Sequence, residues 1–136
     1  MKQLLYQLIF YDNELSYEDY RQEFCIGIFS SFDRAQRAAE YYSGYVEGFK
    51  DYDCSYNILE KELLGDELCG SVYIIWGWNE NENFDEVHII ESDCFVQEET
   101  AREKMAELQK NYSRTNWCID RFVLNECLWK DGFVRV

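Results

Sequence analysis

The 136-residue sequence contains no proline, only seven glycines and a single histidine. Without proline there is no Pro-rich linker, and regular secondary structure is expected along most of the chain. The few glycines form no phosphate-binding loop. Any histidine triad or zinc site would have to use His88, whose nearest thiol, Cys94, follows six residues later on the same predicted strand. That spacing separates the two by about 20 Å, which excludes a dyad within the strand.

Basic residues are also scarce: 13 lysines and arginines face 27 acidic residues, and the net charge is -14. Direct binding of DNA or RNA normally needs a basic face, so this composition argues against it. Every apolar run falls well short of the roughly 18 residues of a membrane helix, and no signal peptide is evident. We therefore expect a cytoplasmic protein without a membrane partner. The acidity either maintains solubility or attracts a basic protein.

The six cysteines include no Cys-x-x-Cys pair, and we expect them to be reduced, buried and small hydrophobic residues. Acidic pairs such as Glu18-Asp19 and Asp85-Glu86 do not follow a calcium-loop pattern, and 27 acidic residues produce such pairs by chance. The sequence thus predicts no catalytic residue, no metal site and no cofactor.

An internal repeat is present, because the second half of the chain resembles the first about 66 residues later. Tyr6–Phe10 returns as Tyr73–Gly77, and Phe29 returns as Phe95. A repeat of this length indicates duplication of an ancestral unit of about 65 residues. Units of that size have marginal cores alone, so the two copies are expected to share one.

Two helices are predicted from apolar stripes at i, i+4, i+7 and i+11. The stripe residues are Ala35, Ala39, Tyr42 and Val46 in the first copy and Ala101, Met105, Leu108 and Tyr112 in the second. Ser30 and Asp33 have the spacing of a capping box at the first helix start. Gly44 and Asn111 are the predicted helix ends.

Short aromatic and β-branched runs predict three strands in each copy. They are residues 4–11, 24–29 and 54–64, then 72–78, 87–95 and 118–129. One helical turn is also predicted at Ser16–Asp19 from its capping-box spacing. The predicted fold class is α+β: two ββαβ repeats, 3–66 and 70–136, with six strands and two helices. They form one two-layer domain, 1–136, with an antiparallel-rich sheet on which both helices pack.

The run from Ile119 to Phe133 resembles the ending of a small bacterial and phage domain family of unknown function. Members of that family have a ββαβ unit that closes with Trp-x-x-Gly-Phe, here Trp129-Lys130-Asp131-Gly132-Phe133. The first copy is similar more faintly, with Leu64 and Glu67-Leu68 in place of this motif. The resemblance implies a tandem duplication of the ββαβ unit and implies no chemistry.

Partner-binding residues are predicted among the aromatics of the second copy: Trp129, Phe133, Trp117 and Trp78. Large aromatic side chains beside acidic ones are typical of interface anchors. They are equally typical of a core that faces helices, and Trp78 shares its strand face with Trp76. Trp129 and Phe133 follow the last predicted strand, where covering the sheet edge is the other interpretation.

The predicted function is a non-enzymatic cytoplasmic protein-interaction module, whose partner is a basic protein or a second copy. An acidic inhibitor or immunity protein for a basic bacterial toxin is a specialised form of this hypothesis. The alternative is a small-molecule-binding protein or enzyme with a site between the two repeats, using His88 or Cys94 with nearby carboxylates.

Overall fold

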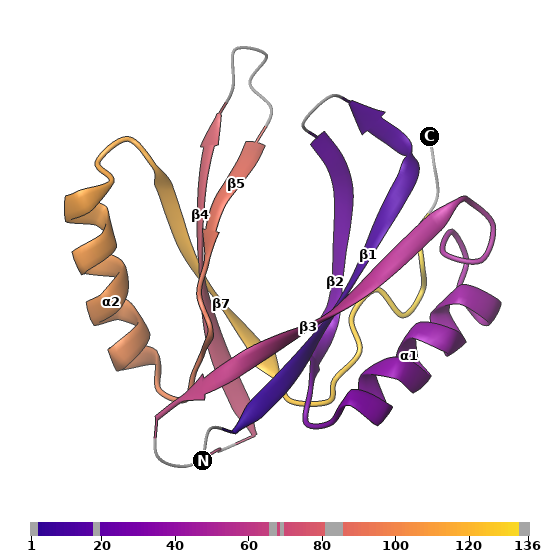
Figure 1. Ribbon diagram of the computed structural model, residues 1–136, viewed down its shortest axis with the longest axis horizontal. Helices are drawn as coiled ribbons and strands as arrows, with labels where there is room; N and C mark the ends of the chain where they lie inside the picture. Colours follow the sequence, from indigo (N-terminus) through magenta and orange to yellow (C-terminus); the bar gives the residue numbers. More distant parts are fainter. Residues whose placement is uncertain (1–2, 18–19, 66–67, 69, 81–85, 134–136) are drawn as a thin grey trace. The chain divides into compact units, whose positions relative to one another are not determined.

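The computed structural model describes residues 3–17, 20–65, 68, 70–80 and 86–133, and side chains outside 14–22 and 80–89. In this part of the chain the fold is α+β, with two helices and seven mostly antiparallel strands (Figure 1). The elements are β1 Leu4–Tyr17, β2 Tyr20–Phe29, α1 Phe32–Tyr45, β3 Cys54–Leu64, β4 Ser71–Glu80, β5 Glu86–Glu91, β6 Cys94–Phe95, α2 Glu98–Asn111 and β7 Asn116–Val123.

The chain divides into two compact units, each named here after its helix. The α1 unit comprises Leu4–Lys61 and Leu124–Val136, and the α2 unit comprises Met1–Gln3 and Glu62–Val123. These bounds differ from those of the predicted repeats, because the chain after β7 packs with the α1 unit. A single domain built from repeats 3–66 and 70–136 stays a prediction.

In the α1 unit, β1 lies between β2 and β3. The β1–β2 ladder is antiparallel and continues to the pairs Ser16↔Arg21 and Tyr17↔Tyr20. The helical turn predicted at Ser16–Asp19 is therefore wrong at its first two residues, where pairing between strands replaces local capping. The other two lie outside the described residues.

Helix α1 packs on β1 and β2 through the predicted stripe, which is confirmed. Its buried members are Ala35, Ala39, Tyr42 and Val46, which meet Phe10 and Phe24 in one core cluster. The N-cap is Ser31 rather than Ser30, since the Ser31 hydroxyl accepts a hydrogen bond from the Arg34 backbone N–H at 3.2 Å. The helix continues one residue past Gly44 and ends at Tyr45.

In the α2 unit, β4 is the central strand. It pairs antiparallel with β7 from Ser71↔Val123 to Trp78↔Asn116, and antiparallel with β5 and β6. The last two residues of β3, Leu63 and Leu64, pair parallel with β6.

The second copy has four strands instead of the expected three, because the predicted strand 87–95 is broken at Ser92 and Asp93. The Ser92 hydroxyl accepts a hydrogen bond from the Ile75 N–H at 2.8 Å, and Asp93 accepts one from the Glu62 N–H at 3.0 Å. The Ser92 N–H still donates to the Ile75 carbonyl at 2.9 Å, but the two side-chain contacts interrupt the regular ladder and separate β5 from β6. The expected count of six strands is therefore wrong for the described residues.

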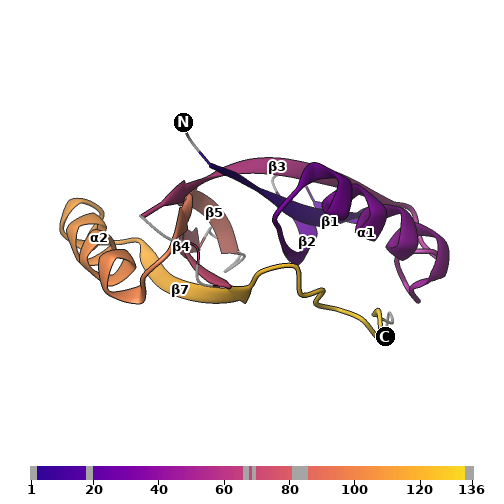
Figure 2. The same ribbon diagram turned by 90° about the horizontal axis from the view of Figure 1, so that it is seen from below.

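Helix α2 lies along the strands of its own unit, as α1 does (Figure 2). Ala101 is fully buried, and Met105 and Leu108 pack partly buried against the same cluster as Ile75. Tyr112 departs from the predicted stripe and is 45% exposed. The helix ends at Asn111 as predicted, and Tyr112 is its C-cap, the position that the buried Val46 has in α1.

Candidate functional site

The C-terminal segment, residues 124–133, follows the last strand. Sequence analysis predicted that this strand would continue to residue 129. Strand β7 ends at Val123, and the chain then runs along the outer edge of β2. The backbone N–H of Asn125 donates to the Ile28 carbonyl at 2.8 Å, and that of Leu128 donates to the Ile26 carbonyl at 2.7 Å. The segment thereby covers a strand edge that would otherwise present unpaired backbone groups.

The Trp-x-x-Gly-Phe motif forms a tight turn at the end of this segment. The Gly132 N–H donates to the Trp129 carbonyl at 2.9 Å, and the Phe133 N–H donates to the Glu47 carbonyl at 3.1 Å. Gly132 has φ +76°, and a Cβ there would overlap the Glu47 backbone. The motif's glycine is thus required by both backbone conformation and close approach.

Phe133 is partly buried and packs against the aromatic core of the α1 unit. Its ring stacks on Phe24 at 4.5 Å between centroids and meets Phe49 edge-on at 5.0 Å. Gly48 allows this approach, because a Cβ at that position would lie 2.5 Å from the Phe133 ring. This environment is that of a core residue, and a role for Phe133 in partner binding stays a prediction.

Trp129 is arranged differently, since it remains 46% exposed. Its ring and the Phe24 ring form a T-shaped pair, with centroids 4.8 Å apart and planes at 88°. Its backbone has φ +58°, a left-handed conformation that is uncommon for a bulky residue. The turn at Gly132 and the core position of Phe133 hold the indole in place.

The other two predicted residues, Trp117 and Trp78, belong to the α2 unit. Trp117 packs over Gly77, its partner across the β4–β7 ladder, and both tryptophans are half-buried. The β5 residue opposite Trp78 is His88, whose side chain lies outside the described residues. Trp129 and Phe133 both contact Phe24, whereas Trp117 and Trp78 lie in neighbouring ladder pairs and therefore point to opposite faces of the sheet.

The exposed large side chains of the α1 unit include Tyr41, Tyr45, Leu128 and Trp129, and these four are called here the aromatic surface. The rings of Tyr41 and Tyr45 stack at 5.4 Å, and Tyr45 is 74% exposed. Tyr41 also meets the buried Tyr42 ring, whose hydroxyl donates to the Leu128 carbonyl at 2.6 Å. These contacts connect the exposed helix tyrosines to the C-terminal segment. Sequence analysis missed both tyrosines because they lie outside the repeated stripe.

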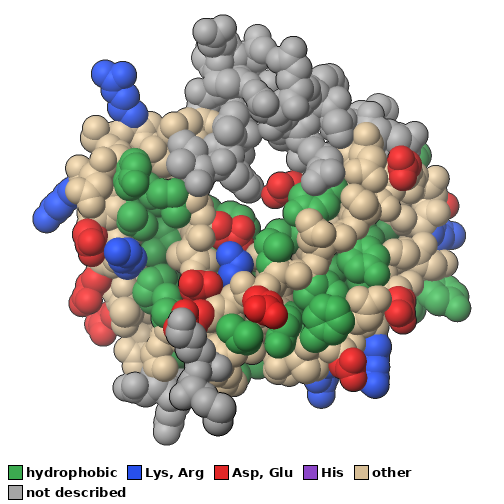
Figure 3. Space-filling view, in the orientation of Figure 1, with side chains coloured by type: hydrophobic (Ala, Val, Ile, Leu, Met, Phe, Trp, Pro, Cys, Tyr) green, Lys and Arg blue, Asp and Glu red, His purple; other side chains and the backbone are tan. Residues whose placement is uncertain are grey.

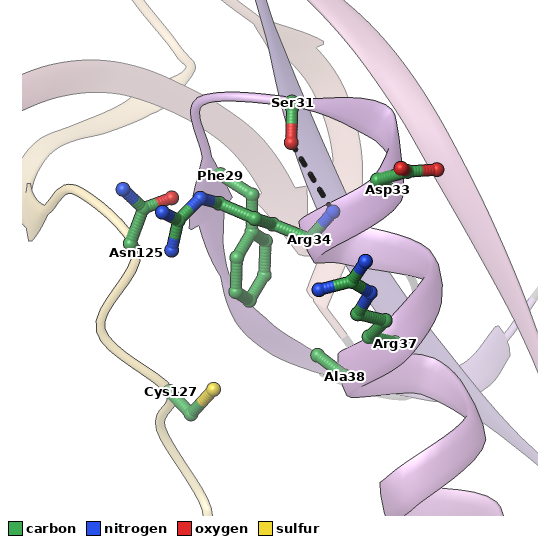
Figure 4. A pocket seen from close by; sticks show the side chains of 8 residues that line it. All are labelled: Phe29, Ser31, Asp33, Arg34, Arg37, Ala38, Asn125 and Cys127. Carbon is green, nitrogen blue, oxygen red and sulfur yellow. Dashed lines mark hydrogen bonds between the residues drawn. The ribbon is translucent and has the colours of Figure 1, made fainter.

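A pocket of about 440 Å³ lies between α1 and the same segment (Figure 4). Its lining comes from the end of β2, the first turns of α1 and the C-terminal segment. The lining residues are Phe29, Ser31, Asp33, Arg34, Arg37, Ala38, Asn125 and Cys127. Figure 4 shows the Arg34 and Arg37 side chains extending from α1 toward the segment that carries Asn125.

The pocket concentrates positive charge in a strongly acidic chain. Within the described residues, neither the Arg34 nor the Arg37 guanidinium makes a hydrogen bond or ion pair, and Asp33 is paired with neither. Over α2, by contrast, basic and acidic side chains alternate (Figure 3), and Arg102 pairs with Glu98 at 2.9 Å. The sequence signal for this pocket is a pair of arginines, Arg34 and Arg37, that follow the N-cap Ser31 and are three residues apart.

Cys127 supplies an apolar thiol to the pocket rather than a nucleophile. Burial raises the pKa of the Cys127 thiol, and burial likewise raises the pKa of the neighbouring Tyr42 hydroxyl. A thiol with a raised pKa is protonated at neutral pH, and it is the thiolate that attacks electrophiles or binds metals. The pocket therefore offers positive charge and hydrogen-bond donors above an apolar floor.

Among the described residues, no group of three or more His, Cys, Asp or Glu side chains is placed to hold a metal ion. The helices in that part of the chain are all too short or too polar to cross a membrane. Comparison of the chain with protein-family models, with curated proteins and with solved structures finds no match.

Proposed function

We propose that this chain is a non-enzymatic protein-interaction module that binds its partner through the aromatic surface of the α1 unit. The observation that carries the proposal is Trp129, a large aromatic residue held in a strained backbone conformation and yet 46% exposed. Tryptophan and tyrosine are the residue types that most often dominate binding energy at interfaces. The cytoplasmic location expected from the sequence is part of this proposal.

The arrangement of the surface supports the choice of these residues. Tyr41 and Tyr45 stack on each other, and the Trp129 ring rests on Phe24, so all three rings are restrained before binding. Restrained aromatic side chains lose little conformational entropy when a partner covers them. The neutral Cys127 thiol is consistent with binding rather than covalent catalysis.

The net charge of -14 favours a basic partner, because complementary charge accelerates association. An inhibitor or immunity protein for a basic toxin is one form that such a pair takes. In that case, association should slow markedly as ionic strength rises, since screening shortens the reach of the charges.

We also infer that the two units descend from one duplicated ββαβ unit. Strand order supports this: the first strand of each copy is central, in the orders β2-β1-β3 and β5-β4-β7. In the α2 unit, β5 and β6 together take the place that β2 has in the α1 unit. In each unit the helix comes next in the chain. The resemblance to the bacterial and phage domain family is part of the same inference.

A capture experiment with matched variants tests the proposed surface. The wild-type chain, Trp129→Ser and Tyr112→Ser are immobilised and exposed to extract of the source cells, and retained proteins are identified by mass spectrometry. Tyr112 is the control because it is 45% exposed but lies on the α2 unit. A true partner is retained by wild type and Tyr112→Ser and lost from Trp129→Ser.

A second variant separates binding from folding. Tyr45→Ser removes a ring that is 74% exposed, so it should leave the unfolding transition unchanged and still weaken partner retention. Partners that bind all variants equally would contradict the proposal. Sedimentation of the wild-type chain tests the homodimer, which should dissociate in Trp129→Ser if the partner is a second copy.

A further inference from the structure

We propose that the pocket between α1 and the C-terminal segment binds the carboxylate group of a ligand whose apolar body lies against Phe29, Ala38 and Cys127. This site is separate from the aromatic surface, and its ligand is an anion rather than the basic partner that the net charge favours. The inference rests on three features of the pocket: its donors, its local charge and its floor.

The donors converge from two chain segments. Arg34 and Arg37 are three residues apart on α1, which places them on the same helix face, and both reach toward the C-terminal segment (Figure 4). Asn125 faces them, and its amide oxygen accepts hydrogen bonds from the Ser30 N–H at 2.9 Å and hydroxyl at 3.3 Å. That orientation leaves the Asn125 amide nitrogen as a third donor. Planar guanidinium groups bind a carboxylate through paired hydrogen bonds.

The local charge selects a monoanion. The two arginines contribute +2 and Asp33, the acidic residue of the lining, contributes -1, so one negative charge on the ligand neutralises the pocket. A dianion such as a phosphate monoester would leave excess negative charge in a chain that already carries -14. Because repulsion grows with ligand charge, the carboxylate is favoured over phosphate.

The floor of the pocket is apolar and its size suits a small ligand. Phe29 is 3% exposed, and Ala38 and Cys127 are half-buried. The volume of about 440 Å³ falls within the range of roughly 300 to 1,000 Å³ typical of small-molecule sites. A ring or branched aliphatic group bearing one carboxylate fills such a space with its charged end toward the arginines.

Benzoate is a suitable probe, titrated into the full chain at constant ionic strength while amide shifts are followed by NMR. We expect shifts at α1 and the C-terminal segment and a Kd on the order of 1 mM, given the small number of ligand atoms. Arg34→Gln and Arg37→Gln should each weaken binding about tenfold, whereas Arg102→Gln on α2 should leave it unchanged. Benzyl alcohol, which lacks the charge, should bind at least tenfold more weakly.

Two further titrations, each with a peptide, identify the source of the carboxylate. The peptide acetyl-Ala-Phe with a free C-terminal carboxylate is compared with its C-terminal amide. Tighter binding of the free-acid peptide than of benzoate assigns the site to a chain terminus, and the reverse assigns it to a small organic acid.

Three results would overturn the proposal. They are an absence of shifts up to about 50 mM benzoate, equal binding by the two arginine variants and wild type, and tighter binding of inorganic phosphate than of benzoate. The amide spectra of Arg34→Gln and Arg37→Gln show directly whether these surface variants remain folded. Loss of benzoate binding in Trp129→Ser is not expected, so the outcome is independent of the aromatic surface.

Discussion

Replacing Gly132 with alanine tests how the C-terminal segment is attached to the α1 unit. The residue has φ +76°, and a Cβ would meet the backbone of Glu47 rather than a side chain that could move aside. The turn would have to open, and the hydrogen bond from the Phe133 N–H to the Glu47 carbonyl would be lost with it. Phe133 would then withdraw from its position on Phe24.

The expected loss of stability follows from these contacts. A Cβ in the left-handed region costs about 1–2 kcal/mol. The lost hydrogen bond adds about 1 kcal/mol, and exposure of the half-buried Phe133 ring adds about 1–2 kcal/mol. The α1 unit should therefore be destabilised by about 3–5 kcal/mol, with the upper limit set by complete release of the segment.

Two other glycines make matched controls for this substitution. Gly44 lies within α1, and no atom lies within 4 Å of the position that a Cβ would take there. Gly44→Ala should therefore stabilise the unit by about 0.5–1 kcal/mol. Gly70 has φ +82° and open space, so Gly70→Ala should show the backbone strain alone, about 1–2 kcal/mol. The same chemical change is thus expected to have three different effects.

Urea unfolding gives the free energies, and hydrogen exchange measured on peptides from residues 124–133 shows whether the segment detaches. If Gly132→Ala loses no more stability than Gly70→Ala, the close approach to Glu47 is not what holds the segment, and the reasoning fails.

Three further predictions concern local contacts. Gly77→Ala should destabilise the α2 unit because its Cβ would lie 2.5 Å from the Trp117 ring, and most of that loss should disappear in a Trp117→Ala background; additive urea-unfolding energies would contradict this. Ser31→Ala removes the N-cap of α1 and should cost about 1 kcal/mol in the same assay, while an unchanged midpoint would show that the cap contributes nothing. Because burial raises the pKa of Cys127, the unfolded chain loses this proton first, so the stability present at neutral pH should fall as pH rises above about 8.5. Cys127→Ala should move the onset of that fall toward the range of Tyr42, and an identical pH profile would refute the assignment.

The helices were predictable because the residues of each buried helix face are regularly spaced within a short stretch of sequence. Apolar residues at i, i+4, i+7 and i+11 form one helix face wherever the helix packs, and duplication supplied the pattern twice. Tyr112 is 45% exposed, whereas Val46, the C-cap at the same stripe position of α1, is buried, so periodicity alone does not determine burial at a helix end.

The break in strand 87–95 could not be predicted, since it depends on partners far away in sequence. Ser92 and Asp93 end β5 by accepting hydrogen bonds from Ile75 and Glu62, and neither partner is visible in a local run of residues. The same reason applies to the C-terminal segment, whose role is determined by the edge of β2.

The predicted partner-binding residues illustrate the limit of composition. Trp129 and Phe133 are both aromatic residues after the last strand, yet Trp129 is 46% exposed and Phe133 is partly buried against the core cluster. The glycine between them decides the difference, because it turns the chain toward Glu47. The arginine pocket was missed because its donors come from positions 91 residues apart, Arg34 and Asn125.

The return of residues 124–133 to the α1 unit also has a consequence for biosynthesis. Strands β1 and β2 and helix α1 leave the ribosome early, but the edge of β2 and the site occupied by Phe133 stay uncovered until the end of this sequence has been made. Domains generally fold in order of synthesis. Here the unit that is begun first is completed last, so a chain truncated after β7 would expose an apolar cleft and a bare strand edge that quality-control proteases and chaperones can bind.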